Sequence, residues 1–130
     1  MGKLTSKQAN ELANNFLAVA QSIGDYRIKN YESLTKNQNL KLRQLHKKTL
    51  DYSDDLFTTS ATLFMEDAEN SLLKLNAITK KIKKSYKSLR DVQKAIDIAT
   101  NVVVLGASIF SLSPPAIIDS IGNLKDAIEG

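Results

Sequence analysis

The sequence predicts an all-α protein: an antiparallel up-down helical bundle of four main helices plus a short C-terminal helix, in one domain spanning residues 1–130. Three observations predict this fold. Of the 130 residues, 42% are apolar and 25% are charged, which is the composition of a globular domain. No Gly or Pro occurs from Asp25 to Leu105, so this span contains no strong helix breaker. Apolar residues recur three and four positions apart along most of the chain, as on one face of a helix.

The first predicted helix begins after Thr5, because Thr5 and Gln8 have the spacing of a capping box. Gly24 is expected to end this helix as a C-terminal cap. A second helix with a thinner apolar stripe is expected from Asp25 to about Leu50.

A turn near residues 49–53 is predicted to separate the second and third helices. Lys47 and Lys48 suit a helix C-terminus, and the carboxylates that follow them suit a helix N-terminus. The third helix is then expected over 53–85, with the 3–4 apolar spacing of a bundle seam or a short coiled coil. The alternative, in which the second and third helices are continuous, stays open.

The fourth predicted helix opens at a capping box over 88–91 and forms the long central hairpin with the third helix. It is amphipathic up to Asn101 and apolar nearly all round from Val102 to Leu112. Ser113 and the two prolines after it begin the short fifth helix. The stripes of all five helices give the expected core: Leu12, Phe16, Leu42, Leu45, Phe57, Phe64, Leu75, Ile82, Ile96, Val103, Phe110, Ile117 and Ile121.

The most apolar passage of the chain admits three interpretations. Residues 98–118 carry no charge, but the double proline interrupts the run before it reaches the roughly 20 residues of a spanning helix. We therefore favour a core helix end. The alternatives are a helix-turn-helix, residues 98–124, that inserts into a membrane, or a subunit interface. The candidate membrane or interface segment comprises Val102, Val103, Val104, Leu105, Ile109, Phe110 and Leu112.

A cluster of basic residues lies directly before this apolar segment. It is a candidate contact for an anionic surface and comprises Lys80, Lys81, Lys83, Lys84, Lys87 and Arg90. Near an anionic membrane each such charge contributes about 1 kcal/mol. The order of long helices, basic cluster and apolar hairpin over 53–128 is similar in gross outline to the soluble form of α-helical pore-forming toxins, without a shared motif. That likeness implies a membrane-active protein as the alternative function.

The same lysines argue only weakly for nucleic acid. Lys80, Lys83, Lys84 and Lys87 share one helix face and could neutralise several phosphates. They also lie at a helix C-terminus, where positive charge is favourable without any partner. Because no helix-turn-helix signature or aromatic platform accompanies them, we do not expect a nucleic-acid-binding protein.

The residue types that catalysis requires do not form a recognisable pattern. The chain has no Cys, which excludes disulfides, zinc thiolate sites and thiol catalysis. The single histidine is His46, and the residue three positions before it is Arg43, where the Glu-x-x-His motif of a di-iron bundle would have Glu. His46 is expected to face solvent, because Arg43, Lys47 and Lys48 surround it in the sequence. Glu66 and Glu69 could share a face, but they fit a solvated helix surface better. We therefore predict no enzyme, no metal and no cofactor.

The predicted function is a non-enzymatic helical-bundle interaction module that binds a protein or a second copy of itself through helix faces. An anionic membrane is the alternative partner. The net charge of +4 permits an acidic partner without requiring one. The N-terminus turns polar at once and has no apolar stretch of a signal peptide, so a cytoplasmic location is the default expectation.

Overall fold

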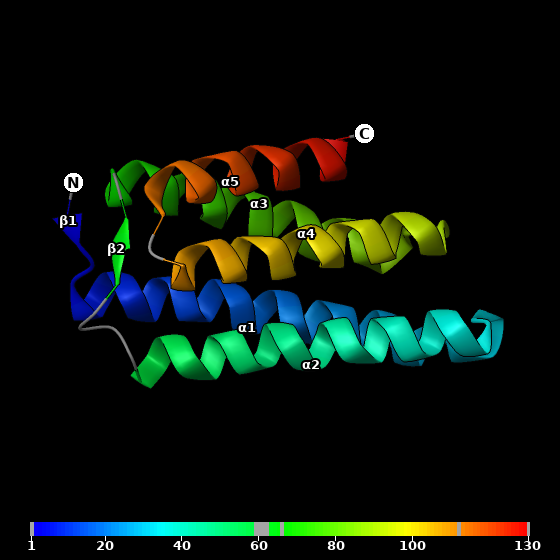
Figure 1. The fold of residues 1–130 in the computed structure, drawn as a ribbon. Helices are drawn as coiled ribbons and strands as arrows, with labels where there is room; N and C mark the ends of the chain where they lie inside the picture. Colours follow the sequence, from blue (N-terminus) through cyan, green and yellow to red (C-terminus); the bar gives the residue numbers. More distant parts are fainter. Residues whose placement is uncertain (1, 59–62, 66, 112, 130) are drawn as a thin grey trace.

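The computed structural model describes residues 2–58, 63–65, 67–111 and 113–129. Within these residues, five α-helices pack against each other as an all-α bundle, and successive helices run in opposite directions (Figure 1). The predicted fold class is confirmed. A continuous hydrophobic cluster receives residues from every α-helix.

Helix α1 (Ser6–Lys29) begins at the predicted capping box. The Gln8 amide donates to Thr5 Oγ1 at 3.0 Å, and the Thr5 amide donates to Gln8 Oε1 at 3.1 Å. The prediction that Gly24 ends the helix is wrong. Gly24 lies inside α1 under the imidazole of His46, where an added Cβ would be 2.9 Å from Cε1 of that ring. Its role is to let the two helices approach closely.

Helix α2 (Lys36–Thr58) follows a 3-10 turn (η1, Tyr31–Ser33) and also begins at a capping box, which Thr35 and Gln38 form. The predicted turn near residues 49–53 is wrong, because α2 continues through it. Two polar residues of that stretch, Thr49 and Ser53, are buried and hydrogen-bonded. Thr49 Oγ1 donates to the Leu45 carbonyl at 2.8 Å, and Ser53 Oγ donates to the Ala13 carbonyl of α1 at 3.1 Å.

The segment between α2 and α3 contains a short strand instead of the predicted helix. β2 (Phe64–Met65) pairs antiparallel with β1 (Gly2–Lys3), with Lys3 opposite Phe64. The apolar residues beside and within β2, Leu63 and Met65, are buried at the end of the bundle. The seam predicted over 53–85 is therefore divided between α2 and α3.

The remaining helices are α3 (Ala68–Ser88), α4 (Val92–Phe110) and α5 (Pro114–Glu129). Asp91, the last residue of the predicted capping box, is the actual N-cap of α4, and its carboxylate accepts from the Lys94 amide at 3.2 Å. α5 begins at its first proline, as predicted.

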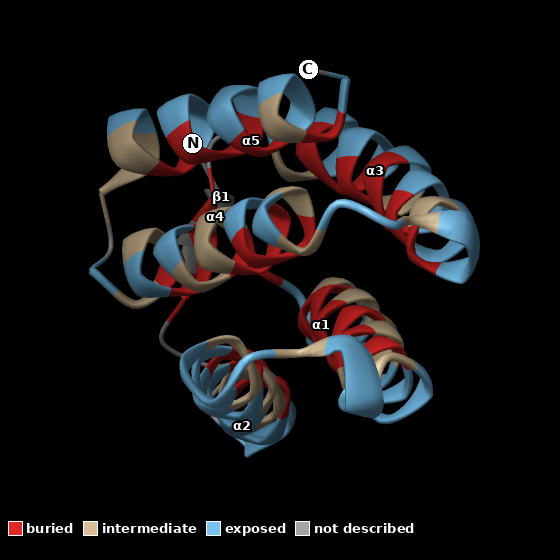
Figure 2. Ribbon diagram, turned by 90° about the vertical axis from the view of Figure 1, so that its right-hand side faces the viewer, coloured by how far each residue is buried: buried red, intermediate tan, exposed pale blue. Residues whose placement is uncertain are grey.

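The helices that follow each other in sequence form two of the closest pairs. α1 packs on α2, and α4 packs on α5, while α3 packs mainly on α1 and more lightly on α5. Seen along the bundle, α3 and α5 lie on the side away from α2 (Figure 2). The prediction that α3 and α4 form the central hairpin is wrong, because the buried face of α4 is directed at α2 and α5.

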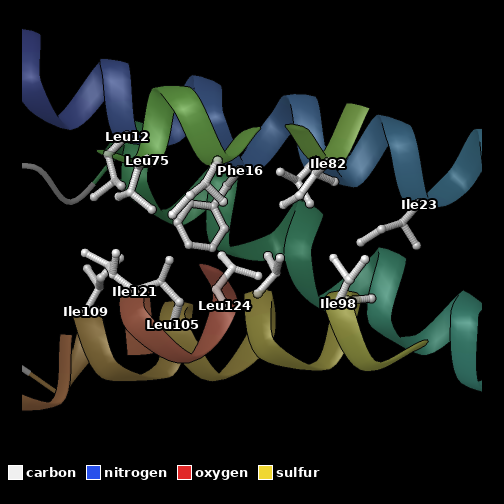
Figure 3. Packing of buried hydrophobic residues seen from close by; sticks show 14 of the residues in the cluster. Leu12, Phe16, Ile23, Leu75, Ile82, Ile98, Leu105, Ile109, Ile121 and Leu124 are labelled. Atoms are coloured by element: carbon white, nitrogen blue, oxygen red, sulfur yellow. The ribbon is translucent and has the colours of Figure 1, made fainter. Parts of the chain in front are cut away.

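Leucine, isoleucine and phenylalanine side chains from α1, α3, α4 and α5 point toward one another in the centre of the bundle (Figure 3). Most of the predicted core residues are buried, and Val103 and Phe110 are half-buried against the cluster. Phe57 is the exception. Its side chain is 42% exposed, because α2 continues past residue 53 and turns this position outward. The side chain of Phe64 lies outside the described part of the structure.

Tyr26 of α1 and Tyr86 of α3 contact each other, with ring centroids 5.3 Å apart. The Tyr86 hydroxyl donates to the Ala95 carbonyl of α4 at 2.7 Å. The Tyr26 hydroxyl is buried and has no hydrogen-bond partner among the described residues. Burial raises the pKa of both phenols above 10.0. Tyr26 further raises the pKa of Tyr86, and the carboxylate of Asp91 further raises that of Tyr26.

These shifts predict that the protein loses stability in alkaline solution. The folded state keeps both phenols neutral, whereas the unfolded chain releases their protons near pH 10. The free energy of unfolding is therefore at its full value below pH 10 and decreases as the pH rises above 10. Urea unfolding at neutral pH and at several values above pH 10 measures the slope of the free energy of unfolding against pH. Tyr86→Phe should be about 1 kcal/mol less stable at neutral pH, because it lacks the Ala95 bond, and should lose less stability above pH 10. Equal slopes for the variant and the wild type would contradict this assignment.

Candidate functional site

The described part of the candidate membrane or interface segment lies in α4 and has two different sides. Val102, Leu105 and Ile109 are buried in the core. Val103 and Phe110 are half-buried, Val104 is 45% exposed, and Leu112 lies outside the described residues. α4 is thus an amphipathic bundle helix in this structure. Within the described residues it is also the one helix long and apolar enough to cross a membrane, and 44% of the relevant window is buried inside the bundle.

Gly106 sits at a close contact between α4 and α2. The ring of Tyr52 lies directly against this glycine, and an added Cβ would be 2.9 Å from the ring's Cγ and nearer still to other ring atoms. The same ring stacks on Phe110 at 5.6 Å between centroids and meets the edge of Phe16 at 6.1 Å. This aromatic group fixes α4 between α1 and α2.

The six basic residues of the predicted anionic-surface contact are all exposed, five on α3 and Arg90 in the α3–α4 connection. Lys81 has an ion-pair partner, Glu129, at 3.5 Å, and within the described ranges the other five have none. The structure does not bring all six together. Lys80 and Lys83 also line a polar groove of about 880 Å³ against α1, whereas Lys81 faces α5. We call the exposed α3 residues Lys80, Lys83, Lys84 and Lys87 the lysine face.

A network of polar side chains lies in the groove between α1 and α3. Asn76 donates to Glu11 Oε1 at 2.8 Å and accepts from Asn15 at 2.8 Å, while Asn15 also donates to the Glu11 carbonyl at 2.9 Å. These bonds hold α3 on α1 and orient the lysine face. Sequence patterns could not reveal the two bonds of Asn76, because its partners Asn15 and Glu11 are more than 60 positions away.

A second groove, between α3 and α5, was not predicted as a site. It has a volume of about 420 Å³, and its apolar lining includes Ile78 and Ile121 at the floor and Ile118 on the α5 wall. We call it the α3–α5 groove. Three lysines stand at its rim: Lys74, Lys81 and Lys125. Helical periodicity could have placed Lys74 and Lys81 on one side of α3, but the facing side of α5 required the tertiary structure.

The single histidine serves the packing of two helices. His46 crosses from α2 to α1, where its Nδ1 lies 2.8 Å from the Ala20 carbonyl oxygen. The expectation that it faces solvent is wrong, since the ring is half-buried over Gly24. Glu69 is exposed and Glu66 lies outside the described residues. In the part of the chain that the structure describes, no three His, Asp or Glu side chains are grouped so that they could hold a metal ion.

Comparison with known proteins adds no family to this picture. No protein-family model, curated protein or solved structure matches the chain.

Proposed function

We propose that this protein is a non-enzymatic interaction module that binds an acidic partner protein through α3. One observation carries the proposal, namely the concentration of positive charge on this helix. α3 contains six lysines and a single carboxylate, Glu69. Its net charge, six minus one or +5, exceeds the net charge of the whole chain, +4. The lysine face has no carboxylate partner within the described residues.

Exposed apolar groups beside these charges favour a protein partner. Leu73 is 60% exposed, and Ala77 is exposed one turn further along the same side of α3. A protein interface combines apolar contacts at its centre with charged groups at its rim. The lysines would accelerate association with an acidic surface, and the apolar groups would slow dissociation. A phosphate backbone would use the lysines but leave Leu73 and Ala77 without a role.

Charge reversal on the outer side of α3 tests this function. Lys80→Glu combined with Lys84→Glu should weaken binding of fluorescent polyglutamate at least tenfold, measured by anisotropy, while the far-UV circular dichroism stays unchanged. The matched control is Lys36→Glu combined with Lys41→Glu, which makes the same charge change at exposed positions of α2. An equal loss in both double variants would mean that net charge, not α3, binds the probe, and the proposal would fail.

A membrane-active protein is the second candidate function, and the length and apolar character of α4 support it. Flotation with vesicles of about 30% anionic lipid tests it, because the lysines and an inserted α4 would hold the protein on such vesicles. Val104→Asp is the informative variant, since Val104 is 45% exposed and its change leaves the core intact. Flotation of the wild type that Val104→Asp loses would replace the interaction module by this candidate. We expect the wild type to stay in the soluble fraction.

A further inference from the structure

The α3–α5 groove has the shape of a docking site for an extended apolar element. α3 and α5 pack only lightly on each other and run side by side on the outer side of the bundle (Figure 2). The floor residues Ile78 and Ile121 are buried, but Ile118 on the α5 wall is 51% exposed. Ile118 therefore contributes an apolar surface that no helix of the bundle covers completely.

Gly122 leaves one wall of this groove empty. A Cβ added at Gly122 would meet no heavy atom within 4 Å, in contrast to Gly24 and Gly106, which lie against rings. Glycine destabilises the interior of a helix relative to alanine. At Gly122 no neighbouring group requires the missing side chain, and the result is an open space between α3 and α5.

The charges at the rim specify the partner's charge. Lys74 and Lys81 are seven residues apart on α3, which is two helical turns or about 10 Å. Lys125 stands on the opposite wall. Lys81 Nζ lies 3.5 Å from Glu129 Oε1 in an ion pair, so this end of the groove accommodates a carboxylate. An occupant that carries acidic residues on both sides of an apolar stripe would match both walls.

We propose that the α3–α5 groove binds an acidic amphipathic helix of a partner protein. The inference rests on the proposed function and adds the site and the chemistry of the partner. An apolar helix face laid into an apolar groove is a recurrent mode of peptide recognition. The rim residues are exposed, so the groove is open along its length, whereas sites for small molecules enclose most of their ligand. A second copy of the chain would bring another strongly basic α3 to the same side, which disfavours self-association there.

A synthetic peptide of about 14 residues is a suitable probe, with leucine at i, i+3, i+4 and i+7 and glutamate at the flanking positions. The wild type should bind this peptide, and binding should shift the methyl resonances of Ile118 and Ile121 but not that of the exposed Ile28 on α1. Gly122→Trp fills the groove and should weaken binding at least tenfold. Asn123→Trp places the same ring on an exposed position of α5 that does not line the groove, and it should bind like the wild type.

The outcomes separate this inference from the proposed function. If Gly122→Trp binds the peptide as tightly as the wild type, or if a peptide of the same composition without the periodicity binds equally well, the groove is not the site. If polyglutamate binding depends on Lys80 and Lys84 but the amphipathic peptide does not bind, the inference fails and the proposed function stands. A concentration-dependent mass that Gly122→Trp abolishes would make a second copy the occupant and would overturn the proposal of a different partner.

Discussion

Gly106→Ala is expected to destabilise the bundle by about 1–3 kcal/mol, the usual effect of forcing an extra group into a packed core. The reason is the ring of Tyr52, which occupies the space where the new methyl group would lie. The ring cannot move aside easily, because it stacks on Phe110 and meets the edge of Phe16. Urea unfolding followed by circular dichroism measures the change in the free energy of unfolding.

Gly122→Ala is the matched control for this prediction. It makes the same chemical change inside a helix, but the new methyl group meets open space, so the variant should gain about 0.5–1 kcal/mol from the better helix propensity of alanine. Combining Gly106→Ala with Tyr52→Leu should recover part of the loss, as a double-mutant cycle would show. If Gly106→Ala stabilises the protein as Gly122→Ala does, α4 does not pack on Tyr52 in the way described.

Val102→Asp is expected to remove about 4 kcal/mol or more of stability, or to prevent folding, because it places an unpaired carboxylate in the core. Val102 is only 2% exposed. Two positions further along, Val104 is 45% exposed, and Val104→Asp should change the free energy of unfolding by less than about 1 kcal/mol. The two variants carry the same substitution on opposite sides of α4.

Thermal and urea unfolding of both variants measures this difference. Equal destabilisation would mean that the outer side of α4 is also covered, either by a second copy or by another part of the chain. A large difference would instead establish that α4 is amphipathic in solution, and Val104→Asp could then be used in the vesicle experiment without loss of the fold.

Much of the fold can be predicted from the sequence, because helices depend largely on local signals. The capping box at Thr5 and the proline start of α5 are contained in a few neighbouring residues, and both are present in the structure. The wrong boundaries have a common cause. Gly24, Thr49 and Ser53 resemble helix ends locally, but each is used for a contact with another helix or for a buried hydrogen bond.

The candidate site could be predicted only in part for the same reason. The lysine face lies on one helix, so its spacing alone brings Lys80, Lys83, Lys84 and Lys87 to one side. The α3–α5 groove needs Lys74 from one helix and Lys125 from another, and their relative position depends on how α3 packs. The sequence patterns predicted α4 as the neighbour of α3. The position of α5 beside α3 depends on tertiary packing, which these patterns do not contain.

The packing of α3 also has a consequence for the order in which the chain folds. The α1–α2 and α4–α5 pairs join neighbours in sequence, so each closes a short loop and loses little chain entropy. α3 packs on α1 across the whole of α2, and on α5 across the whole of α4. Its docking closes longer loops, as does the packing of α4 on α2. The helix that we propose binds the partner is thus attached to the bundle mainly through helices that are not its neighbours in sequence, and a bound partner that also contacts α5 would slow its detachment.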